Sequence, residues 1–116
     1  MPFIRIDVTG PKAADYKRAL LAGTRAAVTK SFGVADDRVT VRVLETPGAD
    51  VDTAPGRTER MTMVDVLMFE GRSAEMKAAM TAALRDALAN SPGIEPSEVV
   101  VNFREADAVD LDVFRG

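Results

Sequence analysis

The sequence predicts an α/β fold, strictly α+β, in which tandem duplicated βαβ units form a four-stranded mixed sheet with two helices on one face. Three observations predict it: segments of alternating apolar and polar residues, two longer segments with apolar residues every three or four positions, and an internal repeat at an offset of about sixty residues. We expect one domain over residues 1–116. It comprises a first repeat (about 2–46), a loop (47–60), a second repeat (about 61–105) and a C-terminal tail (106–116).

The first repeat opens with a predicted strand. Residues 2–9 alternate between two faces, with isoleucine and valine on one of them, until Gly10-Pro11 ends the pattern. Residues 12–33 then show the helical spacing of apolar side chains and stop at a glycine. Residues 39–44 alternate again. A strand, a helix and a second strand joined in this way are typical of a right-handed parallel βαβ unit.

The second repeat has the same order of elements. We expect strands over residues 62–69 and 98–103. Between them a helix is predicted from about 74 to 90, with Ser73 as its N-cap. The two repeats keep the same strand parity, which a chance match rarely does. The aligned pairs are Ile4 and Val64, Ile6 and Val66, Val8 and Met68, Lys12 and Arg72, and Lys17 and Lys77.

One face of the predicted sheet has no helix to cover it. The strand residues that point to this face alternate with the core residues, and several of them are apolar. Because a large apolar surface is unfavourable in water, this composition favours self-association through the open face. Its residues are Phe3, Arg5, Asp7, Met63, Asp65, Leu67 and Phe69.

The composition excludes several classes of function. The chain has no Cys and no His, which excludes thiol chemistry, zinc–thiolate sites and histidine bases. A net charge of −3 gives no basic field for nucleic acid. No apolar run is long enough to cross a bilayer, and the first residues lack the features of a secretory signal. We therefore expect a cytoplasmic protein with no metal, no nucleic-acid partner and no membrane association.

The residue with the clearest chemical potential is Pro2. Removal of Met1 would convert its nitrogen from an amide into a free secondary amine, which is a base. The strand that follows would hold this amine in the fold, whereas most chain termini are frayed. Thr62 occupies the matching position of the second repeat in mid-chain, so only one repeat can offer such an amine. A proline at this position can also simply mark efficient removal of Met1.

Four stretches of the sequence carry a resemblance to a known family. They are Met1-Pro2, Phe32-Gly33-Val34, Asp37-Arg38, and the run from Phe69 to Lys77. With them, nearly the whole chain resembles the tautomerase superfamily, whose members begin with a catalytic proline exposed by loss of the initiator Met. The Glu-Gly-Arg-Ser stretch looks like a motif of 4-oxalocrotonate tautomerase and cis-3-chloroacrylic acid dehalogenase. The doubled length looks most like malonate semialdehyde decarboxylase.

The resemblance implies roles for individual residues. Pro2 matches the proline that acts as general base in tautomerisation, or as general acid in the hydration and decarboxylation branches. Arg72 matches an arginine that binds the substrate carboxylate. Asp37 matches an acidic residue that activates or orients water in the decarboxylase branch. We expect Phe69 and Phe114 to contact the substrate. Phe69 stands where dehalogenase-like members carry an arginine, and Phe114 lies near the position of a C-terminal aromatic residue.

Alternatives remain for three of the candidate residues. Arg42 is expected either to reach a neighbouring subunit's site or to form an interface ion pair, since members with doubled chains resemble one another in forming trimers. Arg72 could instead be a solvated residue at a helix start, although the helix dipole disfavours a cation there. Asp37 could be a turn residue that leads into a strand.

The resemblance implies a cofactor-independent isomerase, a homotrimer that interconverts the keto and enol forms of a small 2-oxo acid. One alternative is decarboxylase-like, hydratase-like or dehalogenase-like action on a three-carbon acid, which would make the protein a lyase. Another is a non-catalytic trimeric module. Glu70 stands where decarboxylase-like members carry a second arginine, and this departure favours the simpler tautomerase assignment.

Overall fold

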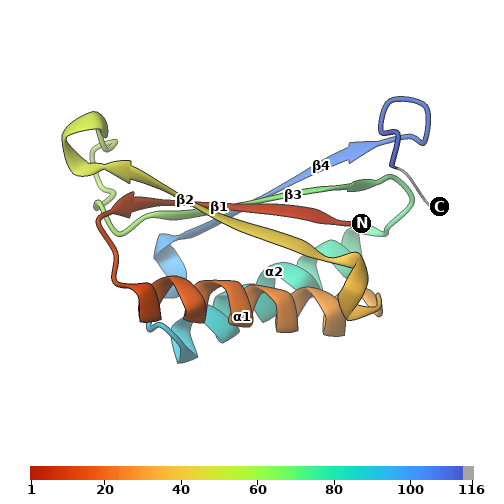
Figure 1. Ribbon diagram of the computed structural model, residues 1–116, viewed down its shortest axis with the longest axis horizontal. Helices are drawn as coiled ribbons and strands as arrows, with labels where there is room; N and C mark the ends of the chain where they lie inside the picture. Colours follow the sequence, from red (N-terminus) through yellow and green to blue (C-terminus); the bar gives the residue numbers. More distant parts are fainter. Residues whose placement is uncertain (114–116) are drawn as a thin grey trace.

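The computed structural model describes residues 1–113 of the chain. Its regular elements follow the predicted order of strand, helix and strand twice over (Figure 1). Within the described residues, short 3-10 helices lie in the connections. The elements are β1 (Phe3–Gly10), α1 (Ala14–Phe32), η1 (Asp36–Arg38), β2 (Thr40–Pro47), η2 (Gly48–Asp50), β3 (Thr62–Phe69), α2 (Ala74–Asn90), η3 (Pro96–Glu98) and β4 (Val99–Ala106).

The strands of the described chain form one four-stranded mixed sheet in the order β2-β1-β3-β4. β1 pairs parallel with β2, and β3 pairs parallel with β4, because a crossover helix connects the two strands of each pair. β1 and β3 pair antiparallel at the centre, so the two βαβ units join side by side. Both helices cover the same face of the sheet and run antiparallel to each other (Figure 1). The predicted fold class is therefore confirmed.

The core lies between the sheet and the two helices. Ile6, Val64 and Val66 of the central strands are completely buried. Leu20 of α1 and Leu84 of α2 supply the opposite side of the core and are also completely buried. Full burial of each such side chain stabilises the fold by about 1.5–3 kcal/mol. This packing fixes the ends of the strands and helices, which is where functional side chains gather.

Two strands continue further than the alternating pattern predicts. β2 ends at Pro47 and β4 ends at Ala106, although the sequence pattern stops earlier in both. The reason is the register, because Gly10 still pairs with Pro47 and Phe69 still pairs with Ala106. A partner strand that continues keeps its neighbour extended even where apolar alternation has ended. β2 lies at the edge of the sheet, where a proline is tolerated.

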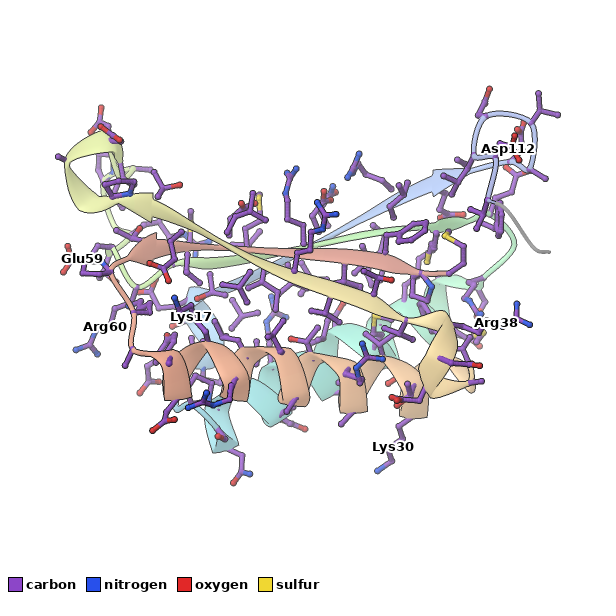
Figure 2. The ribbon with its side chains drawn as sticks, viewed as in Figure 1. Lys17, Lys30, Arg38, Glu59, Arg60 and Asp112 are labelled. Carbon is purple, nitrogen blue, oxygen red and sulfur yellow. The ribbon has the colours of Figure 1, made fainter. Side chains whose placement is uncertain are left out.

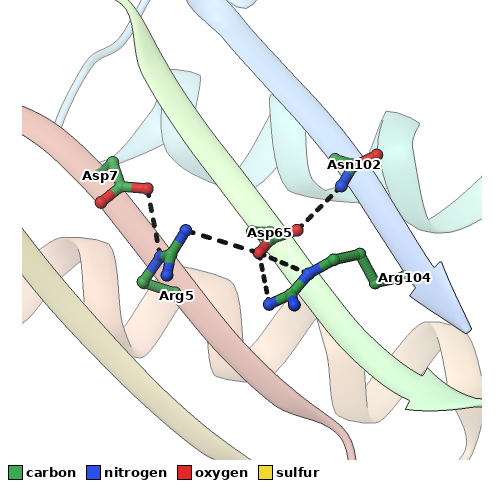
Figure 3. Close-up of polar contacts among 5 residues, drawn as sticks. All are labelled: Arg5, Asp7, Asp65, Asn102 and Arg104. Atoms are coloured by element: carbon green, nitrogen blue, oxygen red, sulfur yellow. Dashed lines mark hydrogen bonds and ion pairs between the residues drawn. The ribbon is translucent and has the colours of Figure 1, made fainter. Parts of the chain in front are cut away.

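The outer face of the sheet, which no described helix covers, carries a polar cluster centred on Asp65 (Figure 3). Asp65 is only 5% exposed although it lies on this face. It accepts hydrogen bonds from Arg104 Nε (2.9 Å) and Asn102 Nδ2 (3.0 Å). Arg5 lies opposite it on β1, with Nη2 3.7 Å from the carboxylate, and also pairs with Asp7 (3.3 Å). These five residues form what we call the Asp65 cluster.

The Asp65 carboxylate is stabilised by its neighbours. Burial alone raises the pKa of Asp65, but hydrogen bonds from Arg104 and Asn102 outweigh the burial, so the pKa lies below its ordinary value. Around the cluster the outer face is apolar in places, as the sequence pattern predicts. Phe3, Leu44 and Met63 are 37%, 41% and 36% exposed.

Candidate active site

Three parts of the chain that are distant in sequence meet at one cavity of about 310 Å³. They are the beginning of β1, the end of α1, and the turn between β3 and α2. The cavity therefore lies at the end of the molecule that carries the N-terminus (Figure 1). Its lining residues are Met1, Pro2, Phe32, Met68, Phe69, Glu70, Gly71, Arg72 and Met76.

Pro2 is buried and lies immediately before β1. Its carbonyl oxygen accepts a hydrogen bond from the backbone N–H of Thr40 (3.3 Å), which extends the pairing of β1 with β2 by one residue. The amino group of Met1 donates a hydrogen bond to the carbonyl oxygen of Arg38. The N-terminus is thus held against η1 and β2, so the sequence prediction of an ordered terminus agrees with the structure.

Arg72 is positioned by the turn that precedes α2. Gly71 has φ 116°, a conformation that favours glycine, and Ser73 caps the helix by accepting a hydrogen bond from the N–H of Met76 (3.1 Å). The Arg72 side chain turns away from its own helix. Its Nη1 donates to the carbonyl oxygen of Phe32 (3.2 Å), and its guanidinium carbon lies 4.2 Å from the centroid of the Phe32 ring.

The environment of Arg72 explains why a cation is tolerated directly before a helix. Phe32 is the last residue of α1, and the helix ends at Gly33 with φ 63°. The carbonyl groups at a helix C-terminus carry the negative end of the helix dipole, which stabilises a cation. The Phe32 ring adds a cation–π contact. The position of Arg72 before α2 is unfavourable for a cation, but the contact of its guanidinium with the C-terminal end of α1 offsets this cost.

The cavity combines an apolar wall with one fixed positive charge. Met68, Phe69 and Met76 supply apolar surface, and Arg72 supplies guanidinium donors. A guanidinium binds a carboxylate in a bidentate manner, because its donors match the two carboxylate oxygens. Glu70 is exposed at the same turn and contributes the opposite charge. The cavity can therefore hold a small organic carboxylate with its apolar part against the methionine and phenylalanine side chains.

Three of the predicted site residues meet in this cavity, namely Pro2, Phe69 and Arg72. Asp37 lies in η1, where it is exposed, and it does not line the cavity. Arg42 is also elsewhere, exposed on β2 at the outer face, where it lines a separate groove. Within a single chain the structure therefore brings together the proposed base and the proposed anchor, but neither Asp37 nor Arg42.

Phe114 lies outside the described residues, so its contact with a substrate stays a prediction. Conversely, sequence reasoning assigned no site role to Phe32, Met68 or Met76, which all line the cavity. Met76 has a sequence signal, because it lies within the run from Phe69 to Lys77 that carries the family resemblance. Phe32 also lies in a stretch that carries the resemblance, but its contact with Arg72 could not be predicted, since that contact depends on how α1 and α2 pack.

The described residues hold no group of three or more His, Cys, Asp and Glu side chains that could bind a metal ion. Within the same residues, no helix is both long enough and apolar enough to cross a membrane.

A family model described as "Tautomerase enzyme" matches residues 52–111. This segment contains Phe69 and Arg72 but not Pro2. A search among curated protein sequences gives no match.

Several solved structures are similar to almost the whole chain. A fused 4-OT, described as a symmetric trimer, is 30% identical with a TM-score of 0.86, and the match covers 98% of this chain and 93% of that one. A protein inactivated by 2-oxo-3-pentynoate is 29% identical with a TM-score of 0.87, over 96% and 90%. Malonate semialdehyde decarboxylase has a TM-score of 0.86 over 98% and 92%, but at 23% identity the likeness concerns the fold alone.

Proposed function

Because this chain belongs to the tautomerase family, we propose that it is a cofactor-independent tautomerase that interconverts the keto and enol forms of a small 2-oxo acid. One observation carries the proposal. Pro2, the candidate base, and Arg72, the candidate carboxylate anchor, line the same cavity although they come from different repeats. A base and an anion anchor in one apolar cavity are two of the groups that this reaction requires.

The base is the nitrogen of Pro2 after loss of Met1. While Met1 is attached, that nitrogen belongs to a tertiary amide and has no lone pair available for a proton. Met1 itself lines the cavity, so its removal leaves the new amine facing the space that a substrate would occupy. Two features favour the neutral, basic form of the amine. Burial disfavours a cation, and the nearby guanidinium of Arg72 repels one, so both lower the pKa of the amine.

The reaction follows from this arrangement. Arg72 binds the carboxylate of the 2-oxo acid and thereby places the adjacent carbonyl group and the third carbon near Pro2. The amine takes a proton from the third carbon, whose bonding electrons form the new double bond while the carbonyl electrons move to oxygen. A water molecule then donates a proton to this oxygen, and the protonated amine returns its proton to the solvent. In the reverse direction, the protonated amine returns its proton to the carbon. General acid–base catalysis of this kind contributes on the order of 10² to 10⁴ in rate.

The proposed assembly is a homotrimer formed through the outer face of the sheet. The similar fused 4-OT is described as a trimer. The outer face carries exposed Phe3, Leu44 and Met63, which association would remove from water. Arg42 lies on this face, so in a trimer it either reaches the site of a neighbouring subunit or forms an ion pair across the interface.

The experiment that tests the proposal is an assay of Pro2→Ala with phenylpyruvate, following the ketonisation of its enol form. We expect kcat/KM to fall by about 10²-fold or more, because a flexible primary amine replaces the constrained secondary one. The mass of the native protein should also lack Met1. A folded Pro2→Ala protein with undiminished turnover would overturn the proposal.

The lyase alternative has weaker support. Malonate semialdehyde decarboxylase is similar in fold alone at 23% identity, and Asp37 does not line the cavity of its own chain. Incubation with malonate semialdehyde followed by product analysis distinguishes the two activities. A non-catalytic trimeric module would turn over neither substrate.

A further inference from the structure

A second cavity, also of about 310 Å³, lies at the opposite end of the molecule from the candidate active site. It is lined by Lys12, Tyr16, Arg60, Gly93, Ile94 and Glu95. Figure 2 places Arg60 near the beginning of α1, whereas Arg38, next to the N-terminus, lies near the end of that helix. The two cavities therefore share no lining residue and lie at opposite ends of α1.

The internal repeat relates the second cavity to the first. At the offset that aligns the two repeats, Lys12 matches Arg72 and Tyr16 matches Met76. Each cavity also lies near a glycine that comes after a helix, since Phe32, which precedes Gly33, lines the first cavity and Gly93 lines the second. Gly33 and Gly93 are equivalent, and both have positive φ (63° and 102°). The second cavity is thus the pseudosymmetric counterpart of the candidate active site.

The counterpart differs from the active site at one decisive position. Thr62, which matches Pro2, lies in mid-chain and is buried in β3. Its nitrogen is an amide nitrogen, so no amine can act as a base there. The second cavity therefore keeps an equivalent of the anion anchor without an equivalent of the base.

The charges in the second cavity favour an anion. Lys12 and Arg60 are both in the lining, and Glu95 is the single carboxylate among these lining residues. Near this end of α1, Asp15 pairs with Arg18, and Glu45 pairs with Lys17 (2.6 Å). Glu45 also accepts a hydrogen bond from the backbone N–H of Lys12 and interacts electrostatically with its ammonium group. Among the described residues, neither the Lys12 ammonium nor the Arg60 guanidinium has a carboxylate within salt-bridge distance. Two cations thus line the cavity and neither forms an ion pair, although Glu45 attracts the Lys12 ammonium at longer range.

The same cavity offers an apolar surface beside the cations. The Lys12 ammonium lies 4.9 Å from the centroid of the Tyr16 ring, and the buried Ile94 is also in the lining. Burial raises the pKa of Tyr16, and the charge of Arg60 offsets this only in part, so the phenol stays neutral and can donate a hydrogen bond. An anion with an attached apolar group fits these side chains best.

We propose that this second cavity binds a small organic carboxylate without converting it, with Lys12 and Arg60 holding the carboxylate and with Tyr16 and Ile94 contacting its apolar part. The inference does not rest on the proposed catalytic function, because it needs no N-terminal amine. It assigns two carboxylate sites to each chain, of which only the site at Pro2 can be catalytic.

The test is an NMR titration of the intact protein with phenylacetate, an inert carboxylate with an aromatic group. We expect saturable shifts of the amide signals of Gly93 and Ile94, in addition to those of Gly71 at the first cavity. The double variant Lys12→Met, Arg60→Met should weaken the response at Gly93 and Ile94 by about tenfold or more, because two charge-assisted contacts are lost. Turnover of phenylpyruvate should not change.

Three controls make the outcome decisive. Titration with 2-phenylethanol, which has the ring but no carboxylate, should give no saturable shift at Gly93. The double variant Arg18→Met, Lys30→Met removes two cations of α1 that line neither cavity and should leave the response intact. Glu95→Gln removes the opposing charge and should tighten binding about two- to fivefold.

Phenylacetate shifts confined to the first cavity would overturn the proposal. So would an unchanged response at Gly93 in the Lys12→Met, Arg60→Met protein, or weaker binding in Glu95→Gln. Failure of the proposed catalytic function would be seen separately, as undiminished turnover by Pro2→Ala, and would leave this titration unaffected.

Discussion

Arg72 donates a hydrogen bond from Nη1 to the carbonyl oxygen of Phe32, and its guanidinium carbon lies 4.2 Å from the centroid of the same residue's ring. One residue thus anchors the guanidinium by both its backbone and its side chain. Phe32 belongs to the first repeat and Arg72 to the second, so this contact joins the two halves at the mouth of the candidate site. The cation is fixed before any substrate arrives, which reduces the entropic cost of binding a carboxylate.

Arg72→Gln tests the anchor directly. We expect kcat/KM for phenylpyruvate to fall by about 10- to 100-fold, mainly through KM, because a hydrogen bond to a charged group contributes about 1.5–3 kcal/mol. Arg72→Lys should recover only part of the loss, since an ammonium group cannot bind a carboxylate in a bidentate manner. Arg18→Gln, on the exposed face of α1, is the control and should behave as wild type. An unchanged KM in Arg72→Gln would exclude the assigned role.

Asp65→Asn tests the cluster on the outer face. Removing one partner of a buried ion pair costs about 3–5 kcal/mol, but Arg5 and Arg104 are 49% and 52% exposed, so water compensates in part. We expect a loss of about 1–3 kcal/mol in the free energy of unfolding, measured by urea denaturation at fixed protein concentration. Asp7→Asn, whose carboxylate is 35% exposed, should cost less than about 1 kcal/mol. Equal losses of unfolding free energy in the two variants would contradict the prediction that Asp65 contributes more to stability than Asp7.

The same carboxylate predicts a dependence of stability on acid. The Arg104 and Asn102 hydrogen bonds hold the pKa of Asp65 below its ordinary value against the effect of burial. A group with a lowered pKa binds fewer protons in the folded state than in the unfolded state, so its stabilisation is complete above about pH 4 and is lost as the pH falls through the folded-state pKa. Urea denaturation of wild type and Asp65→Asn at several pH values should therefore show two stabilities that converge as the pH falls below about 4. A constant difference down to pH 2 would rule this out.

Gly71→Ala tests how precisely the turn before α2 holds Arg72. Gly71 has φ 116°, which an alanine adopts only with strain, so we expect a loss of about 1–3 kcal/mol in stability and a higher KM. Gly48→Ala is the matched control, because its φ is not positive and an added Cβ would meet only Thr9 Cγ2 at 3.8 Å. Stability and KM should be close to wild type in Gly48→Ala. Identical behaviour of the two variants would show that the turn conformation is unimportant.

Much of the fold could be predicted because local patterns and the internal repeat agree. Ile4, Ile6 and Val8 keep the parity of their counterparts in the second repeat, and all three are buried as expected. The burial of Asp65 could not be predicted, since it arises from the register of β1, β3 and β4, which places Arg5 and Asn102 beside it. From the sequence of β3 alone, the Asp65 carboxylate is expected to point into solvent.

The candidate site was predictable where a residue has an unusual position in the sequence or, as for Phe69, falls in a motif that carries the family resemblance. Pro2 directly follows the first residue. Arg72 directly precedes a helix, whose dipole disfavours a cation at that end. Phe32 and Met68 read as ordinary core residues, and their part in the cavity depends on the packing of the helices and the sheet. The end of β2 at Pro47 was missed for a similar reason, because strand pairing and not alternation determines it.

The most direct test of the account is to treat this protein with 2-oxo-3-pentynoate, a compound that inactivates a protein 29% identical to it, and to locate any adduct by mass spectrometry. The reagent carries a carboxylate for Arg72 and an electron-poor alkyne that a neutral amine attacks. After tryptic digestion, we predict that the added mass is on the nitrogen of Pro2 in the peptide Pro2 to Arg5, and that its formation parallels the loss of turnover. Full turnover by a protein that retains Met1, or inactivation with the label on any other residue, would contradict the account.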